Sequence, residues 1–200
     1  MTYTLVADGA SDRVLLPIIT WSLKHLHTNL VVAQWADFSR IPRQKNTVER
    51  LKTALELYPC DVLFVHRDAE GQAPDLRRAE IANALNQTPI RHIPIVPVRM
   101  TEAWLLSNEM AIRSAAGNPN GTEKLRLPDI GTLENLPDPK NVLHEALARA
   151  SGLNRHRRSR LSIPQRVHRI TNYIDDYSGL NVLSAFRTLQ QDIRALVENP

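Results

Sequence analysis

The chain has 200 residues, of which 42% are hydrophobic and 23% charged, and its formal net charge is +4. This length and composition suit one soluble domain with a sizeable core and exclude an intrinsically disordered chain. No apolar run approaches the ~20 residues of a membrane-spanning helix, and the start of the chain lacks the pattern of a secretory signal. The single cysteine, Cys60, excludes an internal disulfide and favours a reducing, cytoplasmic location.

The first half of the chain alternates between predicted strands and predicted helices. Apolar, β-branched runs predict strands over 3–7, 30–35, 62–65 and 93–98. Helical periodicity follows each of them, over 11–26, 47–58, 75–86 and 100–107. Pro17 predicts a kink or a later start for the first helix, while Thr47 and Asp75 are the predicted caps of the next two. Pro94 and Pro97 favour an edge position or an early end for the fourth strand. The alternation predicts an α/β fold with a mostly parallel, Rossmann-like sheet flanked by helices.

The second half of the chain does not continue the alternation of strands and helices. Prolines and glycines over 117–140 predict a long irregular loop, and helices are predicted over 141–150 and 181–197. Between Ala146 and Ile174 there are seven arginines and no acidic residue. We therefore expect an α/β core over 1–116, the loop over 117–140, and a helical, basic C-terminal appendage over 141–200 that packs on the core. A basic segment of this kind suits contacts with phosphate groups.

Two acidic clusters follow two of the predicted strands. Asp8 and Asp12 come after the first strand, and Asp68 and Glu70 after the third. Ligand sites in open α/β sheets form at the carboxyl ends of the strands, so these four carboxylates are expected to meet there. Four carboxylates repel one another unless a cation lies among them, and hard oxygen ligands suit Mg²⁺ or Mn²⁺. The alternative is that these acids cap helices at ordinary strand-to-helix turns.

Three motifs, in this order, resemble a known family. They are Asp-Gly-Ala-Ser-Asp at 8–12, Glu-Ala-Trp-Leu-Leu at 102–106 and Asp-Pro-Lys at 138–140. The chain resembles the TOPRIM domains of topoisomerases, primases and OLD-type nucleases, and more closely a group of small bacterial TOPRIM-like proteins. That family usually has Glu where this chain has Asp8, and Asp-x-Asp where this chain has Asp68-Ala69-Glu70. The resemblance implies a TOPRIM-type sheet and partnership with an ABC-type ATPase in phage defence.

If the chain is active, the resemblance implies metal-assisted phosphodiester hydrolysis. Asp68 and Glu70 would hold the metal, and Asp8 would complete its ligands or act as a general base. Asp12 is a further candidate ligand, with helix capping as its alternative role. Glu102, after the fourth strand, is a candidate third acid, whose alternative is an ordinary acid in the first turn of a helix. Either His66 or Arg67 is a candidate for stabilising charge on the phosphate, since alternation along the strand directs only one of them to the site. For His66 the alternative is a core or surface histidine.

The basic segment supplies the predicted nucleic-acid contacts. The candidate side chains are Arg155, Arg157, Arg158 and Arg160, together with Lys140. Arginine binds phosphate oxygens through two parallel hydrogen bonds, and such contacts are independent of base sequence. A solvated loop, or a surface for an acidic partner protein, is the alternative.

Three functional hypotheses follow from the sequence. The first is a cytoplasmic, Mg²⁺-dependent nuclease acting on DNA or RNA as the effector of a bacterial defence system. The second is a non-catalytic subunit that binds nucleic acid or regulates an ATPase complex. The third is a metal-dependent phosphatase or phosphotransferase acting on small molecules. No phosphate-binding loop of the P-loop type is present, so ATP hydrolysis by this chain alone is not expected. The C-terminal helices are candidates for contact with an ATPase or with a second copy of the chain.

Overall fold

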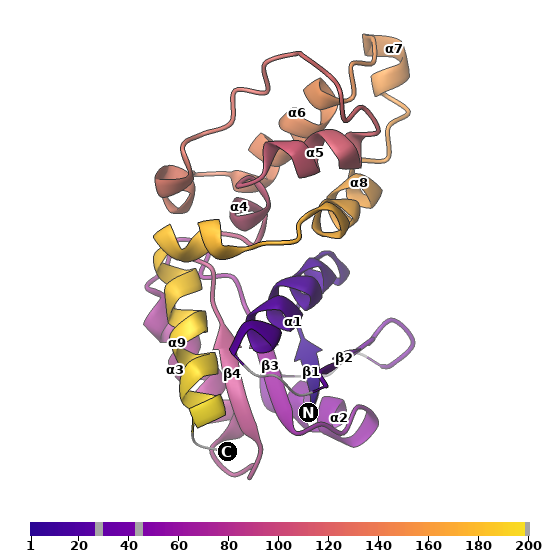
Figure 1. The fold of residues 1–200 in the computed structure, drawn as a ribbon. Helices are drawn as coiled ribbons and strands as arrows, with labels where there is room; N and C mark the ends of the chain where they lie inside the picture. The colour runs from indigo at the N-terminus through magenta and orange to yellow at the C-terminus, as the bar shows by residue number, and fades with distance from the viewer. Residues whose placement is uncertain (27–29, 43–45, 199–200) are drawn as a thin grey trace. The chain divides into compact units, whose positions relative to one another are not determined.

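The computed structural model describes residues 1–26, 30–42 and 46–198. They form two compact units, the first of which comprises Met1–Val98 and the C-terminal stretch from Thr188, and the second Arg99–Arg187 (Figure 1). This division differs from the expected core of residues 1–116. Residues 99–116 are helical and pack with the later helices, whereas most of the last helix belongs with the sheet.

A four-stranded parallel sheet forms the centre of the first unit, which confirms the predicted α/β fold class. Its strands are β1 (Thr2–Val6), β2 (Val32–Trp35), β3 (Val62–His66) and β4 (Arg91–Ile95), in the order β2-β1-β3-β4 (Figure 1). Every residue of β3 is buried, as expected for a central strand covered on both faces. The predicted edge position of β4 is confirmed. The backbone carbonyl of Ile95 accepts the N–H of Arg67, which follows β3, so the backbone groups of Ile95 face β3. The backbone of the preceding residue, Pro94, which lacks an N–H group, therefore faces the open side.

Helices cover both faces of this sheet. On one face α2 (Thr47–Leu57) and α3 (Pro74–Leu85) pack against apolar side chains that include Leu63 and Val65. On the other face lies α1 (Leu15–Leu26). The hydroxyl of Tyr3 lies 2.9 Å from the backbone carbonyl of Leu16 in α1, to which it donates, and the ring of Tyr3 meets Phe64 edge-on at 5.2 Å. The last helix, α9 (Ser184–Glu198), joins this layer through a 2.6 Å hydrogen bond from Gln190 to Ser22.

Some predicted helix starts are wrong by a few residues. The predicted helix from Ser11 begins as a 3₁₀ turn, η1 (Ala10–Val14), and becomes α-helical at Leu15. Pro17 therefore lies in the first α-helical turn, where its missing N–H removes no intrahelical hydrogen bond. Asn46, rather than Thr47, caps α2, since its side chain accepts from the backbone N–H of Glu49 at 2.9 Å.

The third helix also begins earlier than predicted. Its first residue is Pro74, which follows Ala73 at the N-cap position, so Asp75 lies in the first turn instead of capping the helix.

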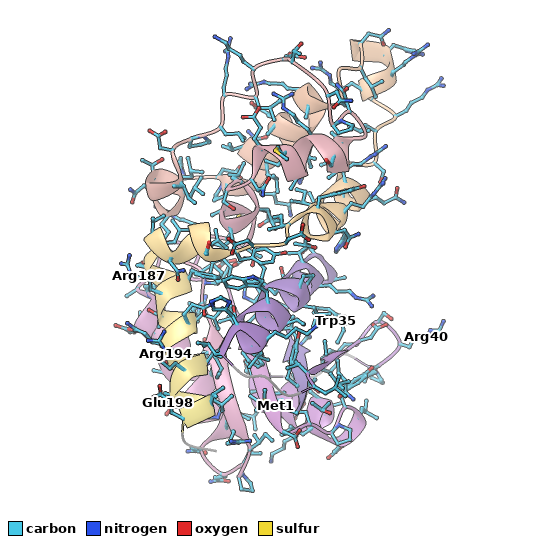
Figure 2. All side chains as sticks on the ribbon, in the orientation of Figure 1. Met1, Trp35, Arg40, Arg187, Arg194 and Glu198 are labelled. Carbon is cyan, nitrogen blue, oxygen red and sulfur yellow. The ribbon has the colours of Figure 1, made fainter. Side chains whose placement is uncertain are left out.

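The strand β2 is an edge strand, and the loop after it carries Arg40, whose side chain extends away from the sheet (Figure 2).

The second unit is helical. Its elements are α4 (Glu102–Leu105), α5 (Glu109–Ala116), η2 (Ile130–Asn135), α6 (Pro139–Ala150), α7 (Arg155–Arg158), α8 (Ile163–Ile170), η3 (Thr171–Tyr173), η4 (Ser178–Val182) and the start of α9. Buried Trp104 meets Phe186 edge-on, with ring centroids 5.5 Å apart. The closing helix begins at Ser184, and not at residue 181 as predicted. The carboxylate of Glu134 accepts the backbone N–H groups of Ser184 and Ala185, and so caps that start.

The predicted irregular loop over 117–140 is tied to the helices around it. Arg113, buried in α5, donates to the backbone carbonyl of Glu123 at 2.7 Å, and Arg149 of α6 donates to that of Leu125 at 3.1 Å. In the described part of the chain, no helix combines the length and the apolar character needed to cross a membrane.

Candidate active site

The acids singled out in the sequence lie at one end of the sheet. Asp8 follows β1, and Asp68 follows β3, so both stand at the carboxyl ends of adjacent parallel strands. From β1 the chain passes to β2 on one side and then to β3 on the other, which makes the β1/β3 junction the topological switch point. Ligands of doubly wound sheets bind in the crevice outside this point.

His66 is the centre of the first group of charges. It ends β3, and its side chain is only 1% exposed. The Nδ1 atom lies 3.1 Å from the backbone carbonyl of Ile95. The Nε2 atom lies 3.7 Å from Oδ1 of Asp12 and 3.5 Å from Oδ1 of Asp68. A carbonyl and two carboxylates accept hydrogen bonds, so these surroundings favour the doubly protonated, charged form of the ring.

The pKa values of this group agree with that assignment. Burial is the largest influence on His66 and by itself lowers its pKa, but the hydrogen bond and charge of Asp12 and the charge of Asp68 together outweigh it and raise the pKa. For Asp12, burial raises the pKa, and the stronger combined effect of His66 and the backbone N–H of Gly9 lowers it below its usual value. Each partner therefore stabilises the charged form of the other.

This geometry gives His66 a positioning role. Its ring joins η1, which carries Asp12, to the loop after β3, which carries Asp68. The same Asp12 accepts the backbone N–H of Gly9 at 3.0 Å, so it also serves the capping role that was the alternative. The side chain of His66 is only 1% exposed, and its predicted role at the phosphate stays a prediction.

A second group of charges holds the other two predicted ligands. Asp8 accepts from Nε of Arg67 at 3.2 Å, and Arg67 also pairs with Glu80 of α3. Glu80 accepts from Arg77 at 3.0 Å, and Arg77 approaches Glu70 to 3.9 Å. The predicted carboxylates are thus divided between two groups: Asp12 and Asp68 face one imidazolium, whereas Asp8 and Glu70 belong to an alternating chain of acids and arginines.

Arg50 is a residue of this end of the sheet that the sequence analysis missed. From α2, its guanidinium donates to the backbone carbonyl of Ala7 at 2.5 Å and lies 4.2 Å above the ring of Phe38. Arg77 and Glu80 were missed as well. The Arg77–Glu80 pair has the i,i+3 spacing of neighbours on one helix face, which is a signal that the sequence offers. The contacts of Glu80 with Arg67 and of Arg50 with Ala7 join different elements, and no local pattern marks them.

Glu102 and the basic residues belong to the second unit. Glu102 begins α4, and its expected place beside the other acids stays a prediction. Arg157 and Arg160 are exposed, while Arg158 donates to the backbone carbonyl of Leu153 at 3.2 Å. The side chain of Arg155 lies outside what the structure describes.

Lys140 is separated from the arginines by the length of a helix. It lies in the first turn of α6, and α7 begins only after the last turn. At 1.5 Å per residue, α6 extends about 15 Å beyond Lys140, and the place of Lys140 beside the arginines stays a prediction.

The carboxylate oxygens at this end of the sheet are the type of ligand that a hard cation such as Mg²⁺ prefers. Within residues 1–26, 30–42 and 46–198, no group of three or more His, Cys, Asp or Glu side chains is placed to bind a metal together. Mg²⁺ commonly keeps several waters and is bound by one or two carboxylates plus the phosphates of its substrate. The carboxylate pair of Asp12 and Asp68, which faces one point, fits that pattern of ligation.

A hollow of about 730 Å³ lies elsewhere in the first unit. Its lining comes from α3, β4 and α9, along the open edge of β4, whereas the carboxylates lie in the loops after β1 and β3. The ion pair of Arg78 with Asp192, at 2.8 Å, joins the two helices there.

No family model, curated protein or solved structure matches this chain. The resemblance to TOPRIM-like proteins therefore stays a prediction.

Proposed function

We propose that the protein is a Mg²⁺- or Mn²⁺-dependent nuclease whose active site is the crevice at the carboxyl ends of β1 and β3. The observation that supports this most directly is the approach of Asp12 and Asp68 to a single atom, Nε2 of His66, at the switch point of the sheet. The two carboxylates, one from η1 and one from the loop after β3, both face that ring, and in this proposal they would hold a cation beside it.

The residues of the crevice have distinct roles in this proposal. Asp12 and Asp68 would hold the ion, and His66 keeps the two loops that carry them in place. A bound divalent cation supplies Lewis-acid polarisation of a phosphoryl oxygen and lowers the pKa of a bound water. Asp8, whose side chain is 62% exposed, is accessible for taking a proton from the attacking water. Arg67, which is bound to Asp8, offers positive charge for the phosphate.

Metal binding tests the proposal. Calorimetric titration with Mg²⁺ and with Mn²⁺ should give binding to the native chain and a large loss of affinity in Asp68→Asn, which keeps the shape of the side chain. Asp75→Asn, an identical change in the first turn of α3, is the matched control and should bind like the native chain. A thermal melt of each variant separates lost ligation from lost folding. Binding that is the same in all three chains contradicts the metal site.

A second candidate is the non-catalytic subunit that binds nucleic acid or a partner. The observation that favours it is that each carboxylate already faces a protein cation: Asp8 faces Arg67, and Asp12 and Asp68 face His66. In such a protein these pairs would keep the loops together without chemistry. Tight binding of nucleic acid without cleavage, in the presence of either metal, would favour this candidate.

The proposal extends to the localisation, the partner and the assembly of the protein. We expect a cytoplasmic protein that acts with an ABC-type ATPase in phage defence, with nucleic acid as substrate and a homodimer as an alternative assembly. Co-expression with an ATPase encoded beside the protein, followed by purification through one subunit, tests the partnership. Size-exclusion chromatography with light scattering tests the dimer.

A further inference from the structure

The arginines of the second unit are not equivalent. Arg149, Arg158 and Arg166 each donate to a backbone carbonyl, those of Leu125, Leu153 and Ala115. Arginine near the end of a helix often satisfies carbonyls in this way. These three side chains therefore hold the unit together, and the cations that are available to a ligand must lie elsewhere.

One face of α8 presents such cations. The helix packs on α5 and α6 through its apolar side, where Val167 and Ile170 are buried (Figure 1). The opposite side is exposed and polar, with Gln165, His168 and Arg169 on α8 and Asn172 in the adjoining η3 (Thr171–Tyr173). Their spacing of three and four residues favours a single face. No acidic residue lies between Ala146 and Ile174, so the segment itself supplies no carboxylate beside Arg169.

An exposed aromatic ring continues this face. Tyr173, in η3, is 42% exposed, although most large apolar side chains of the chain are buried. Nη2 of Arg169 lies 3.1 Å from the hydroxyl oxygen of Tyr173, to which it donates. The contact keeps the ring and the guanidinium side by side. A flat ring beside an arginine is the arrangement on which proteins stack unpaired bases while they bind the adjoining phosphate.

We propose that the exposed face of α8 and η3, formed by Gln165, His168, Arg169, Asn172 and Tyr173, binds single-stranded nucleic acid, with one base stacked on Tyr173. This rests on the proposed nucleic-acid function and names its substrate class. In a duplex the bases are stacked on each other and leave no face for Tyr173, so the proposal predicts preference for single strands. Two acids, Asp175 and Asp176, follow Tyr173. Asp176 accepts from Ser178, which directs its carboxylate into its own turn.

Fluorescence anisotropy tests this face. The full chain is titrated, in EDTA to prevent cleavage, into labelled oligo(dT), oligo(rU) and a duplex of the same length. Single strands should bind more tightly than the duplex. Tyr173→Ala should weaken single-strand binding by about five- to 150-fold, the cost of one lost stacked base. Tyr173→Phe keeps the ring and should bind within a few-fold of the native chain. A comparison of oligo(dT) with oligo(rU) distinguishes DNA from RNA as the source of the strand.

The salt dependence gives a second readout, which a merely structural role would not change. Arg169→Gln should make the slope of log K against log salt shallower by about 0.7, the value for one phosphate contact in a single strand. Arg194→Gln is the matched control, because Arg194 is exposed on α9 (Figure 2) and should leave the slope unchanged. Circular dichroism checks that each variant is folded.

The outcomes separate this face from the proposed nuclease. Equal affinity for duplex and single strand, unchanged binding by Tyr173→Ala, or no binding of any oligonucleotide would each overturn the assignment of this face. If Tyr173→Ala binds normally while Asp68→Asn abolishes cleavage in Mg²⁺, the nuclease stands and its substrate binds elsewhere. If single-strand binding depends on Tyr173 and no cleavage occurs, this face stands as the binding site of a non-catalytic protein.

Discussion

Replacement of His66 by leucine should destabilise the protein strongly, and the loss should depend on pH. Leucine fills a similar volume but removes the charge that faces Asp12 and Asp68. Breaking a buried ion pair by removal of one partner costs about 3–5 kcal/mol. The two carboxylates are 14% and 25% exposed and keep some hydration, so we expect the lower end, about 3 kcal/mol. For a chain of this length, that lowers Tm by about 6–12 °C.

The pH dependence has a definite sign. The pKa of His66 is raised in the folded state, so its stabilisation is fully present below the unfolded pKa of about 6.5 and is lost as the pH rises through the folded value. The pKa of Asp12 is lowered, so its stabilisation is present above its unfolded pKa of about 3.9 and is lost as the pH falls through the folded value. The free energy of unfolding should therefore be highest between these limits.

Urea denaturation from acid to alkaline pH measures this effect. The difference in free energy of unfolding between the native chain and His66→Leu should be largest near pH 6. It should shrink at alkaline pH, where the native histidine also becomes neutral. His92→Leu is the matched control, because His92 lies on the neighbouring strand β4 and its Nδ1 lies 3.3 Å from a neutral group, the backbone carbonyl of Ile90. A difference that is the same at pH 6 and pH 9, or an imidazole NMR titration of His66 with its midpoint below 6.5, would refute the reasoning.

Two further predictions concern local backbone structure. Asn46→Ala should lower the free energy of unfolding by about 1 kcal/mol, because it removes the cap of α2. Thr47→Ala should lower it by less, because Thr47 is not the cap. Urea denaturation of both variants measures the difference. Gly117→Ala should destabilise the chain by about 1 kcal/mol or more, since φ there is +84° and a Cβ would lie 3.2 Å from Nη1 of Arg166. Gly131→Ala should leave the stability nearly unchanged, because a Cβ there would meet no atom within 4 Å. Thermal melts of both variants measure the two effects, and equal losses of stability would contradict this account.

Local patterns were sufficient for the fold class and the four strands of the first unit, but not for its boundary or for the place of α9. The uniformly apolar run over 62–65 indicated a strand buried on both faces, and β3 is buried throughout. The two prolines near Ile95 indicated an edge or an early end, because proline cannot donate to a neighbouring strand. The alternation of strand and helix was sufficient for a parallel sheet. From the parallel sheet it followed that Asp8 and Asp68 would stand at the same end of neighbouring strands.

Only the tertiary structure decided which charges meet. Sequence reasoning grouped the four carboxylates around one cation, whereas the fold places His66 between Asp12 and Asp68 and joins Asp8 to Arg67. Hydrogen bonds and ion pairs depend on side-chain direction over distances of a few ångströms, and that direction is set by packing between elements far apart in the chain. The periodicity of one segment carries no information about such contacts. The sequence by itself determined that Asp8 and Asp68 follow two parallel strands, and the packing determined which partner each charged side chain meets.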